Sequence, residues 1–177
     1  MVFSIAQIDI EGDGRLGISP LPGRDGAPLA DLSTIARWGA DIVVSMTTMA
    51  EMARLGAEDL AGDLALMDVA HAHFPIPDFN APPPDAPWAA LSAQLHATLD
   101  RGGAVLLHCM AGRGRSGMVA LRLMVERNEA PDAALARLRA ARPGAVETRG
   151  QMAWATAPAP LPPLRARSSP ERRPRNA

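Results

Sequence analysis

Short apolar runs and helix-spaced apolar residues alternate along most of the chain. The run Ala104–His108 is typical of a strand buried on both faces of a sheet. The segment 115–127 follows it with helical spacing, and Leu29–Trp38 shows the same spacing before the β-branched run Asp41–Ser45. The other expected elements are an edge strand at 15–21, a strand at 70–76, and helices at 48–55, 57–66, 85–99, 132–141 and 148–154.

This alternation predicts an α/β fold, with one domain built on a central, mostly parallel sheet flanked by helices. The pattern ends near Thr156. From Ala157 to Ala177 the chain consists mainly of Pro, Arg, Ser and Ala without apolar periodicity, a composition typical of disorder. We therefore expect a folded domain over residues 1–156 and a disordered Pro/Arg-rich tail over 157–177.

Charge and cysteine content limit the possible functions. The tail carries five Arg and one Glu, or +4, so the remainder of a chain with net charge −1 carries −5. Nucleic acids require a basic surface, so no nucleic-acid partner is expected. No run approaches the length of a membrane span, and no secretory leader is visible. A single cysteine cannot form an intramolecular disulfide, which favours a cytoplasmic location.

That cysteine, Cys109, opens the segment that carries the chemistry, a loop between the buried strand and a helix. Five residues separate it from Arg115, and Gly112 and Gly114 allow the chain to curl so that successive N–H groups form an anion nest. The following helix directs its N-terminal dipole to the same point, and the Arg115 guanidinium can bind two phosphate oxygens. The groups expected to bind phosphate belong to Met110, Ala111, Gly112, Arg113, Gly114 and Arg115.

The same surroundings favour a reactive sulfur. Helix N-termini and neighbouring cations stabilise the thiolate of a cysteine, so Cys109 is predicted to be a nucleophile. Ser116 follows Arg115 directly and can donate a hydrogen bond to the sulfur when it becomes a leaving group.

The sequence His108-Cys109-x5-Arg115-Ser116, between a strand and a helix, resembles the signature of the cysteine-dependent protein-tyrosine/dual-specificity phosphatase superfamily. The segment Phe74–Pro82, which contains Asp78, resembles the general-acid loop of that superfamily. The segment Arg142–Thr148, with Gln151 after it, resembles a downstream segment of the small dual-specificity-like members. The resemblance extends over Gly14–Trp154, so it implies a phosphatase domain at 1–156 and excludes the tail.

This resemblance implies a phosphoric monoester hydrolase that forms a phosphocysteine intermediate. Cys109 attacks phosphorus, and Asp78 protonates the leaving oxygen and then acts as base toward water. Arg115 and the loop amides stabilise the charge on the phosphoryl oxygens. His108 holds the Cys109 backbone and tunes the thiolate, and Gln151 positions the water. The implied enzyme needs no metal or organic cofactor. We also expect the protein to be a monomer.

Three functions follow from these residues. The first is a phosphoprotein phosphatase acting on phosphotyrosine and also on phosphoserine/threonine. The second is an inositol-phosphate or phosphoinositide phosphatase, which would follow if Arg113 adds a second positive charge at the mouth of the loop. The alternative for Arg113 is a solvated loop residue. The third is a catalytically silent phosphate-binding module, against which the intact Cys109, Arg115 and Asp78 argue.

Other interpretations of the same residues explain less. The pattern Gly112-x-Gly114-x-x-Gly117 also fits a dinucleotide fingerprint, but it stands too late for an opening βαβ unit. The chain has no Lys, which excludes a Walker-type loop. Asp68 and Asp85 are the alternatives to Asp78 as general acid. His71 and His73 share one strand face without further metal ligands nearby, so a structural role is expected for both.

Overall fold

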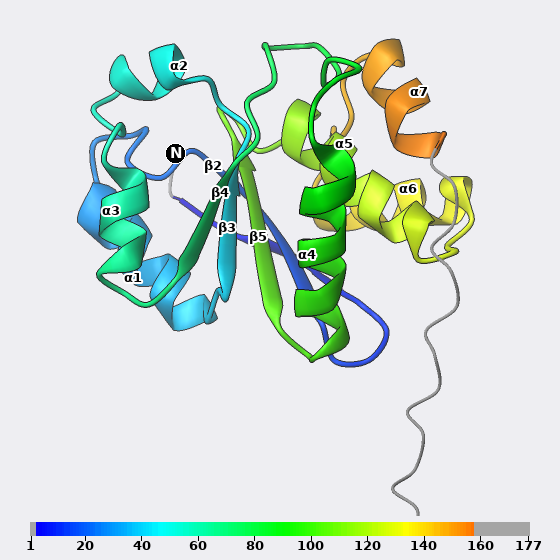
Figure 1. The fold of residues 1–177 in the computed structure, drawn as a ribbon, viewed down its shortest axis with the longest axis horizontal. Helices are drawn as coiled ribbons and strands as arrows, with labels where there is room; N and C mark the ends of the chain where they lie inside the picture. Colours follow the sequence, from blue (N-terminus) through cyan, green and yellow to red (C-terminus); the bar gives the residue numbers. More distant parts are fainter. Residues whose placement is uncertain (1–2, 158–177) are drawn as a thin grey trace, which may run out of the picture.

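The computed structural model describes residues 3–157, and the predicted disordered tail lies outside this range except for Ala157 (Figure 1). That the domain ends at Thr156 therefore stays a prediction. The strands are β1 Ala6–Asp9, β2 Arg15–Pro20, β3 Ile42–Ser45, β4 Ala70–His73 and β5 Ala104–Cys109. The helices are α1 Pro28–Trp38, α2 Met49–Ala53, α3 Leu60–Ala65, α4 Trp88–Asp100, α5 Gly114–Glu126, α6 Pro131–Ala141 and α7 Arg149–Thr156.

The five strands form one sheet in the order β1-β2-β5-β3-β4. All pairs are parallel except β1 with β2, so the expected mostly parallel α/β fold is confirmed. Strand β5 lies at the centre and is buried along its whole length, as its uniform apolar run predicts. The carboxyl ends of β2, β3, β4 and β5 consequently meet at one edge of the sheet.

The prediction of an edge strand at 15–21 is wrong. Strand β2 lies inside the sheet, because β1 pairs with it in antiparallel register from Ala6↔Ile18 to Asp9↔Arg15. Strand β1 was not expected. Its signal is the alternation that places Ile8 and Ile10 in the core while Gln7 and Asp9 remain exposed.

Helices cover both faces of the sheet (Figure 1). α1 and α3 lie on one side, while α4 and α5 lie on the other, with α6 and α7 packed outside α5. Alternate residues of β5 serve the two cores, since Leu106 packs with the α1–α3 cluster and Leu107 with the α4–α5 cluster. Within residues 3–157, no helix is long and apolar enough to cross a bilayer.

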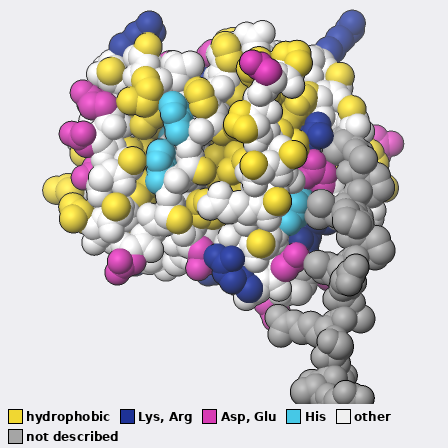
Figure 2. All heavy atoms as spheres, viewed as in Figure 1, with side chains coloured by type: hydrophobic (Ala, Val, Ile, Leu, Met, Phe, Trp, Pro, Cys, Tyr) yellow, Lys and Arg dark blue, Asp and Glu magenta, His cyan; other side chains and the backbone are white. Residues whose placement is uncertain are grey.

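Strand β4 ends earlier than expected, at His73, and the chain continues alongside β3. The amide of Phe74 donates to Ser45 O at 2.9 Å and that of Ile76 to Met46 O at 3.1 Å. Figure 2 shows histidine side chains at the surface along β4, with hydrophobic side chains between β4 and α4. This extension carries residues 77–80 to the same edge of the sheet as the end of β5.

Candidate active site

The loop that follows β5 lies where the parallel strands end, the usual ligand-binding edge of an open α/β sheet. We call residues 109–114 the Cys109 loop. Gly112 has φ +64°, and a Cβ at this position would lie 2.5 Å from Ser19 O, so only glycine fits here. The close contact with the end of β2 gives the loop a tight curl.

The carbonyl groups of the Cys109 loop bond to the rest of the protein. Arg142 donates from Nε to Gly112 O at 2.6 Å and from Nη2 to Ala111 O at 2.7 Å. Arg24 Nη1 donates to Met110 O at 3.0 Å. The sequence drew attention to Arg142 only as part of the resembling downstream segment, and its contact with the loop arises from the tertiary fold.

The amide groups of this loop are free. Within residues 3–157, no backbone N–H from 110 to 116 donates a hydrogen bond to another group. These amides surround the beginning of α5, where the helix dipole also favours an anion. Unpaired amides at the start of a helix are what an anion-binding loop requires, and phosphate binding by this loop stays a prediction.

Cys109 is 3% exposed, and its Sγ lies 3.3 Å from Ser116 Oγ. The neighbouring His108 is fully buried and shares a 2.5 Å hydrogen bond through Nε2 with Ser45 Oγ. Burial, followed by the charge of His71, lowers the pKa of His108 to about 3. A neutral imidazole beside the cysteine fits a supporting role better than proton transfer.

The two histidines of β4 also have polar partners. His71 Nε2 shares a hydrogen bond with Ser45 Oγ at 2.8 Å, and His73 Nε2 lies 2.8 Å from Thr47 O. Burial and the neighbouring His73 lower the pKa of His71. Both side chains thus join β4 to β3, as a structural role requires.

Arg115 is the largest fully buried side chain and is 1% exposed. Its Nη1 and Nη2 each donate to one oxygen of the Glu51 carboxylate at 2.8 Å, and Nη1 also donates to Ile76 O at 3.0 Å. Its Nε has no acceptor among the described residues. The guanidinium edge formed by Nε and Nη2 is therefore the one that can receive an oxyanion.

Glu51 is a site residue that the sequence reasoning missed. Thr48 and Glu51 form a capping box at the start of α2, with Thr48 N donating to Glu51 Oε2 at 2.8 Å. Burial raises the pKa of Glu51, but hydrogen bonds from Arg115 and Thr48 outweigh burial and lower it to about 2. The capping pattern is visible in the sequence, whereas the partner Arg115, 64 residues away, is not.

Asp78 lies directly over this arginine. Its Oδ1 forms an ion pair with Arg115 Nη2 at 3.1 Å, while its side chain remains 52% exposed. The structure thus brings Cys109, Arg115 and Asp78 together. Of the alternative acids, Asp68 precedes β4 and so lies at the opposite edge of the sheet, and Asp85 lies in the turn before α4.

Gln151 is fully buried at the start of α7. Its Oε1 accepts from Glu147 N at 2.9 Å and from Thr148 N at 3.3 Å, and its Nε2 donates to Asn80 O at 3.4 Å. The side-chain amide is thus bonded to backbone groups, and one of them, Asn80 O, lies two residues after Asp78.

Arg113 is exposed at the mouth of the loop and precedes α5. Burial, followed by the positive charge of Arg113, lowers the pKa of the Arg142 guanidinium. The Arg113 side chain also passes close to Gly144, two residues after Arg142. Arg142, bonded to Gly112 O and Ala111 O, is a second positive charge near Arg113.

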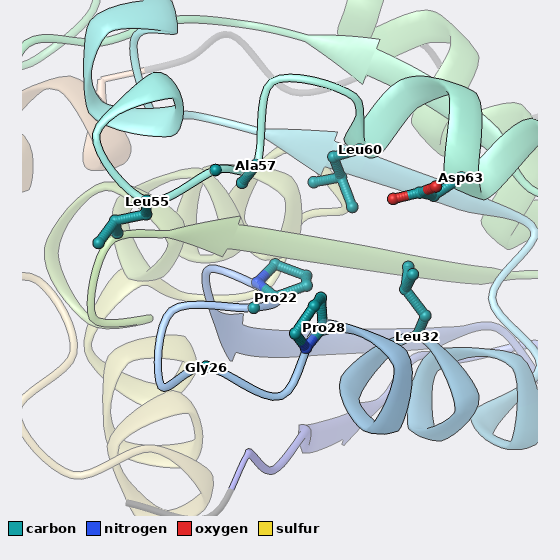
Figure 3. Close-up of a pocket in the computed structure, with 10 residues that line it drawn as sticks. Pro22, Gly26, Pro28, Leu32, Leu55, Ala57, Leu60 and Asp63 are labelled. Atoms are coloured by element: carbon teal, nitrogen blue, oxygen red, sulfur yellow. The ribbon is translucent and has the colours of Figure 1, made fainter.

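A hollow lies between the loop before α1 and the loop before α3 (Figure 3). Its lining is mainly apolar and includes Pro22, Pro28, Leu55 and Leu60. Leu21, at the start of one wall, donates from its backbone N to Met110 O at 3.4 Å. The other wall follows α2, whose Glu51 pairs with Arg115 in the first turn of α5.

Comparison with known proteins agrees with this arrangement. Residues 20–128 match the Tc-R-P family, described as a polymorphic toxin system, DSP-PTPase phosphatase. Tk-PTP in its active form is 33% identical, with a TM-score of 0.65 over 80% of this chain and 88% of that chain. A kinase-associated phosphatase with its catalytic cysteine replaced by serine is 22% identical, with a TM-score of 0.77 over 88% and 93%.

A third structure, PTPMT1 in complex with PI(5)P, is 17% identical, with a TM-score of 0.64 over 80% of this chain and 87% of that chain. The family match covers well over half of the chain and includes both Asp78 and the whole Cys109 loop. The chain therefore belongs to the DSP-PTPase phosphatases, within the dual-specificity and protein-tyrosine phosphatase superfamily.

Proposed function

We propose that the protein hydrolyses phosphomonoesters on phosphorylated proteins, phosphotyrosine and also phosphoserine/threonine, through a phosphocysteine intermediate. One observation carries this proposal. The free amides of residues 110–116, the unpaired Nε of Arg115 and the sulfur of Cys109 belong to one loop and the first turn of α5. This set of groups suits a phosphoryl group with a nucleophile beneath it.

In the first step, the Cys109 thiolate attacks phosphorus, and the bond from phosphorus to the ester oxygen breaks. The phosphoryl oxygens bind the loop amides and the Nε–Nη2 edge of Arg115, which displaces Asp78 from Nη2. Asp78, whose side chain is half exposed and next to Arg115, gives its proton to the departing oxygen. Glu51 keeps the guanidinium in place during this exchange, because its two hydrogen bonds use the adjacent Nη1–Nη2 edge and leave Nε and the second hydrogen of Nη2 for the phosphoryl oxygens.

In the second step, water attacks the phosphocysteine. Asp78 accepts the proton of the water, the sulfur–phosphorus bond breaks, and inorganic phosphate and the thiolate are released. Ser116 Oγ, at 3.3 Å from Sγ, can donate a hydrogen bond to the departing sulfur. His108 remains neutral and supports the end of β5.

The apolar hollow between the loops before α1 and α3 also favours a protein substrate. A phosphorylated side chain in a polypeptide brings neighbouring residues with it, and an apolar neighbour can bury its surface against Pro22, Leu55 and Leu60. A free inositol phosphate has no apolar group to place there.

The nucleophile and acid are tested with aryl phosphates and phosphopeptides. We expect Cys109→Ser to abolish turnover while inorganic phosphate still binds, because the amides and Arg115 remain. Asp78→Ala should slow the hydrolysis of phenyl phosphate by about 10²–10⁴-fold and should slow the hydrolysis of esters with good leaving groups much less. Turnover in Cys109→Ser contradicts the mechanism, and a wild-type protein that binds phosphate without hydrolysing any ester is a binding module.

The cations Arg113 and Arg142 favour a second candidate, a phosphatase for inositol phosphates or phosphoinositides. A second phosphate on the substrate would meet Arg113 at the mouth, and the attraction would weaken with salt. Under our proposal, Arg113→Leu changes kcat/KM by less than about twofold for phosphopeptides and for inositol phosphates. A selective, salt-sensitive loss of tenfold or more for an inositol polyphosphate, about 1.4 kcal/mol, supports the second candidate instead.

A further inference from the structure

The segment 77–80, here the Asp78 loop, is a tight turn that bonds to the rest of the protein on two sides. On one side it follows Ile76, whose amide donates to Met46 O at 3.1 Å and whose carbonyl accepts from Arg115 at 3.0 Å. On the other side it meets the start of α7. Thr148 Oγ1 donates to Phe79 O at 3.2 Å, and Gln151 Nε2 donates to Asn80 O at 3.4 Å.

Bonds within the turn set its shape but not its position. Asn80 N donates to Pro77 O at 3.1 Å, and Asn80 Nδ2 donates to Asp78 O at 2.9 Å. Phe79 has φ +60°, a left-handed conformation that is costly for a residue with a side chain. Phe79 is 61% exposed, so its burial contributes little to holding the turn against the domain.

The two donors at the start of α7, the N-cap residue Thr148 and Gln151, are themselves fixed. Thr148 Oγ1 accepts from Gln151 N at 3.2 Å, and the Gln151 amide oxygen bonds back to the Thr148 backbone, a complete capping box. Gln151 is fully buried, so its Nε2 can point in few directions. The start of α7 therefore presents two preset donors to the two carbonyls that follow Asp78.

We propose that Thr148 and Gln151 are positioning residues that hold the Asp78 loop over Cys109, and that Gln151 acts through this loop rather than on the hydrolytic water. The inference rests on the proposed role of Asp78 as general acid. A carboxyl group must lie within hydrogen-bond distance of the leaving oxygen to protonate it. Loosening the turn lowers the fraction of molecules in which Asp78 lies within that distance. Hydrolysis of esters whose leaving group needs an acid therefore becomes slower.

Thr148→Asp separates this role from helix capping. Aspartate is among the best N-cap residues, so it still accepts from Gln151 N, but its ionised carboxylate has no hydrogen to donate to Phe79 O. Thr148→Ser keeps both bonds. Thr156→Ala is the matched control, because it removes a side-chain bond to Met152 O at the far end of the same helix.

We expect Thr148→Asp to lower kcat/KM for phenyl phosphate about tenfold, a part of the 10²–10⁴ that general acids contribute, and for 4-nitrophenyl phosphate by less than about twofold. Thr148→Ser and Thr156→Ala should match wild type on both substrates. In the Asp78→Ala background, Thr148→Asp should cause no further loss, because the two residues act on one step. An equal loss on both substrates, or losses that multiply in the double variant, overturns the inference.

Gln151→Glu provides a second test, since it keeps the acceptor of the capping box and removes the donor to Asn80 O. We expect the same selective loss on phenyl phosphate and no burst of nitrophenol. A burst of nitrophenol, with an unchanged ratio of kcat/KM between the two esters, means that hydrolysis of the phosphocysteine has become slow. Gln151 would then position the hydrolytic water, and the inference would be overturned. If Asp78→Ala itself slows both esters equally, the acid assignment fails. A selective loss in Asp78→Ala without one in Thr148→Asp overturns this inference alone.

Discussion

The ion pair between Glu51 and Arg115 gives a quantitative expectation for the substitution Glu51→Gln. The glutamine side chain has almost the same size, but it carries no charge and has only one oxygen. It cannot accept from both Nη atoms of Arg115 while also accepting from Thr48 N, as the carboxylate does. Arg115, 1% exposed, would keep Asp78 as its remaining acidic partner at 3.1 Å.

The pKa of Glu51 sets the size of the effect. A pKa lowered from 4.5 to about 2 means that the folded protein prefers the ionised carboxylate. At about 1.4 kcal/mol for each pKa unit, ionised Glu51 stabilises the folded state by about 3 kcal/mol. Loss of one partner from a buried pair costs a similar amount, about 3–5 kcal/mol. For a domain of this size, about 3 kcal/mol lowers Tm by roughly 6–12 °C.

The pH dependence identifies the cause. Because the folded pKa is lowered, the stabilisation is fully present above pH 4.5 and is lost as pH falls toward 2. Thermal unfolding by circular dichroism should therefore show a large gap between wild type and Glu51→Gln at pH 7, which narrows as the pH falls below 4.5. Glu58→Gln, at an exposed position before α3, is the matched control and should shift Tm little at any pH.

Two results would refute this reasoning. A Glu51→Gln protein as stable as wild type at pH 7 means that Asp78 and solvent replace the carboxylate at no cost. A gap in Tm that stays constant down to pH 2 means that shape, rather than charge, causes the loss.

Two further substitutions test the rest of the structure. Glu126 is buried between α4 and α5, where its carboxylate accepts hydrogen bonds from Trp88, Ser92, His96 and Arg122. Burial raises the pKa of Glu126, but these hydrogen bonds outweigh burial and lower the pKa to about 2. Glu126→Gln should lower the urea-unfolding free energy by about 3 kcal/mol near pH 7 with KM for an aryl phosphate unchanged, and an unaffected unfolding curve would contradict this. Gly112→Ala places a Cβ 2.5 Å from Ser19 O at φ +64°, so it should weaken competitive inhibition by inorganic phosphate at least tenfold, about 1.4 kcal/mol; Gly62→Ala, which meets open space, should not.

The strand–loop–helix unit around Cys109 could be predicted because its determinants are local. A continuous apolar run specifies the buried strand β5, two glycines permit the curl, and the five-residue spacing to Arg115 closes it. The relative positions of β5, the Cys109 loop and the start of α5 depend on chain geometry within about a dozen residues. The identity of the superfamily followed from the same short segment.

Strand pairing could not be predicted in the same way. The segment Arg15–Pro20 resembles an edge strand when taken alone, and only the antiparallel pairing with β1 places it inside the sheet. The alternation in Ala6–Asp9 is short, and four residues carry little information about a partner. A strand's place in a sheet depends on contacts with other segments. The composition of the strand alone determines that place only when it is uniformly apolar, as in β5.

The arginines illustrate the division most clearly. All 18 basic residues are Arg, so residue type alone cannot distinguish a phosphate ligand from a solvated side chain. The sequence by itself determined the role expected of Arg115, because the five residues between Cys109 and Arg115 limit how far apart the two can lie. Only the tertiary structure decided that Glu51, 64 residues away, orients Arg115, and that Arg142, 30 residues beyond Gly112, holds the loop carbonyls. Hydrogen bonds act over about 3 Å in space, and the fold alone brings such distant residues within that range.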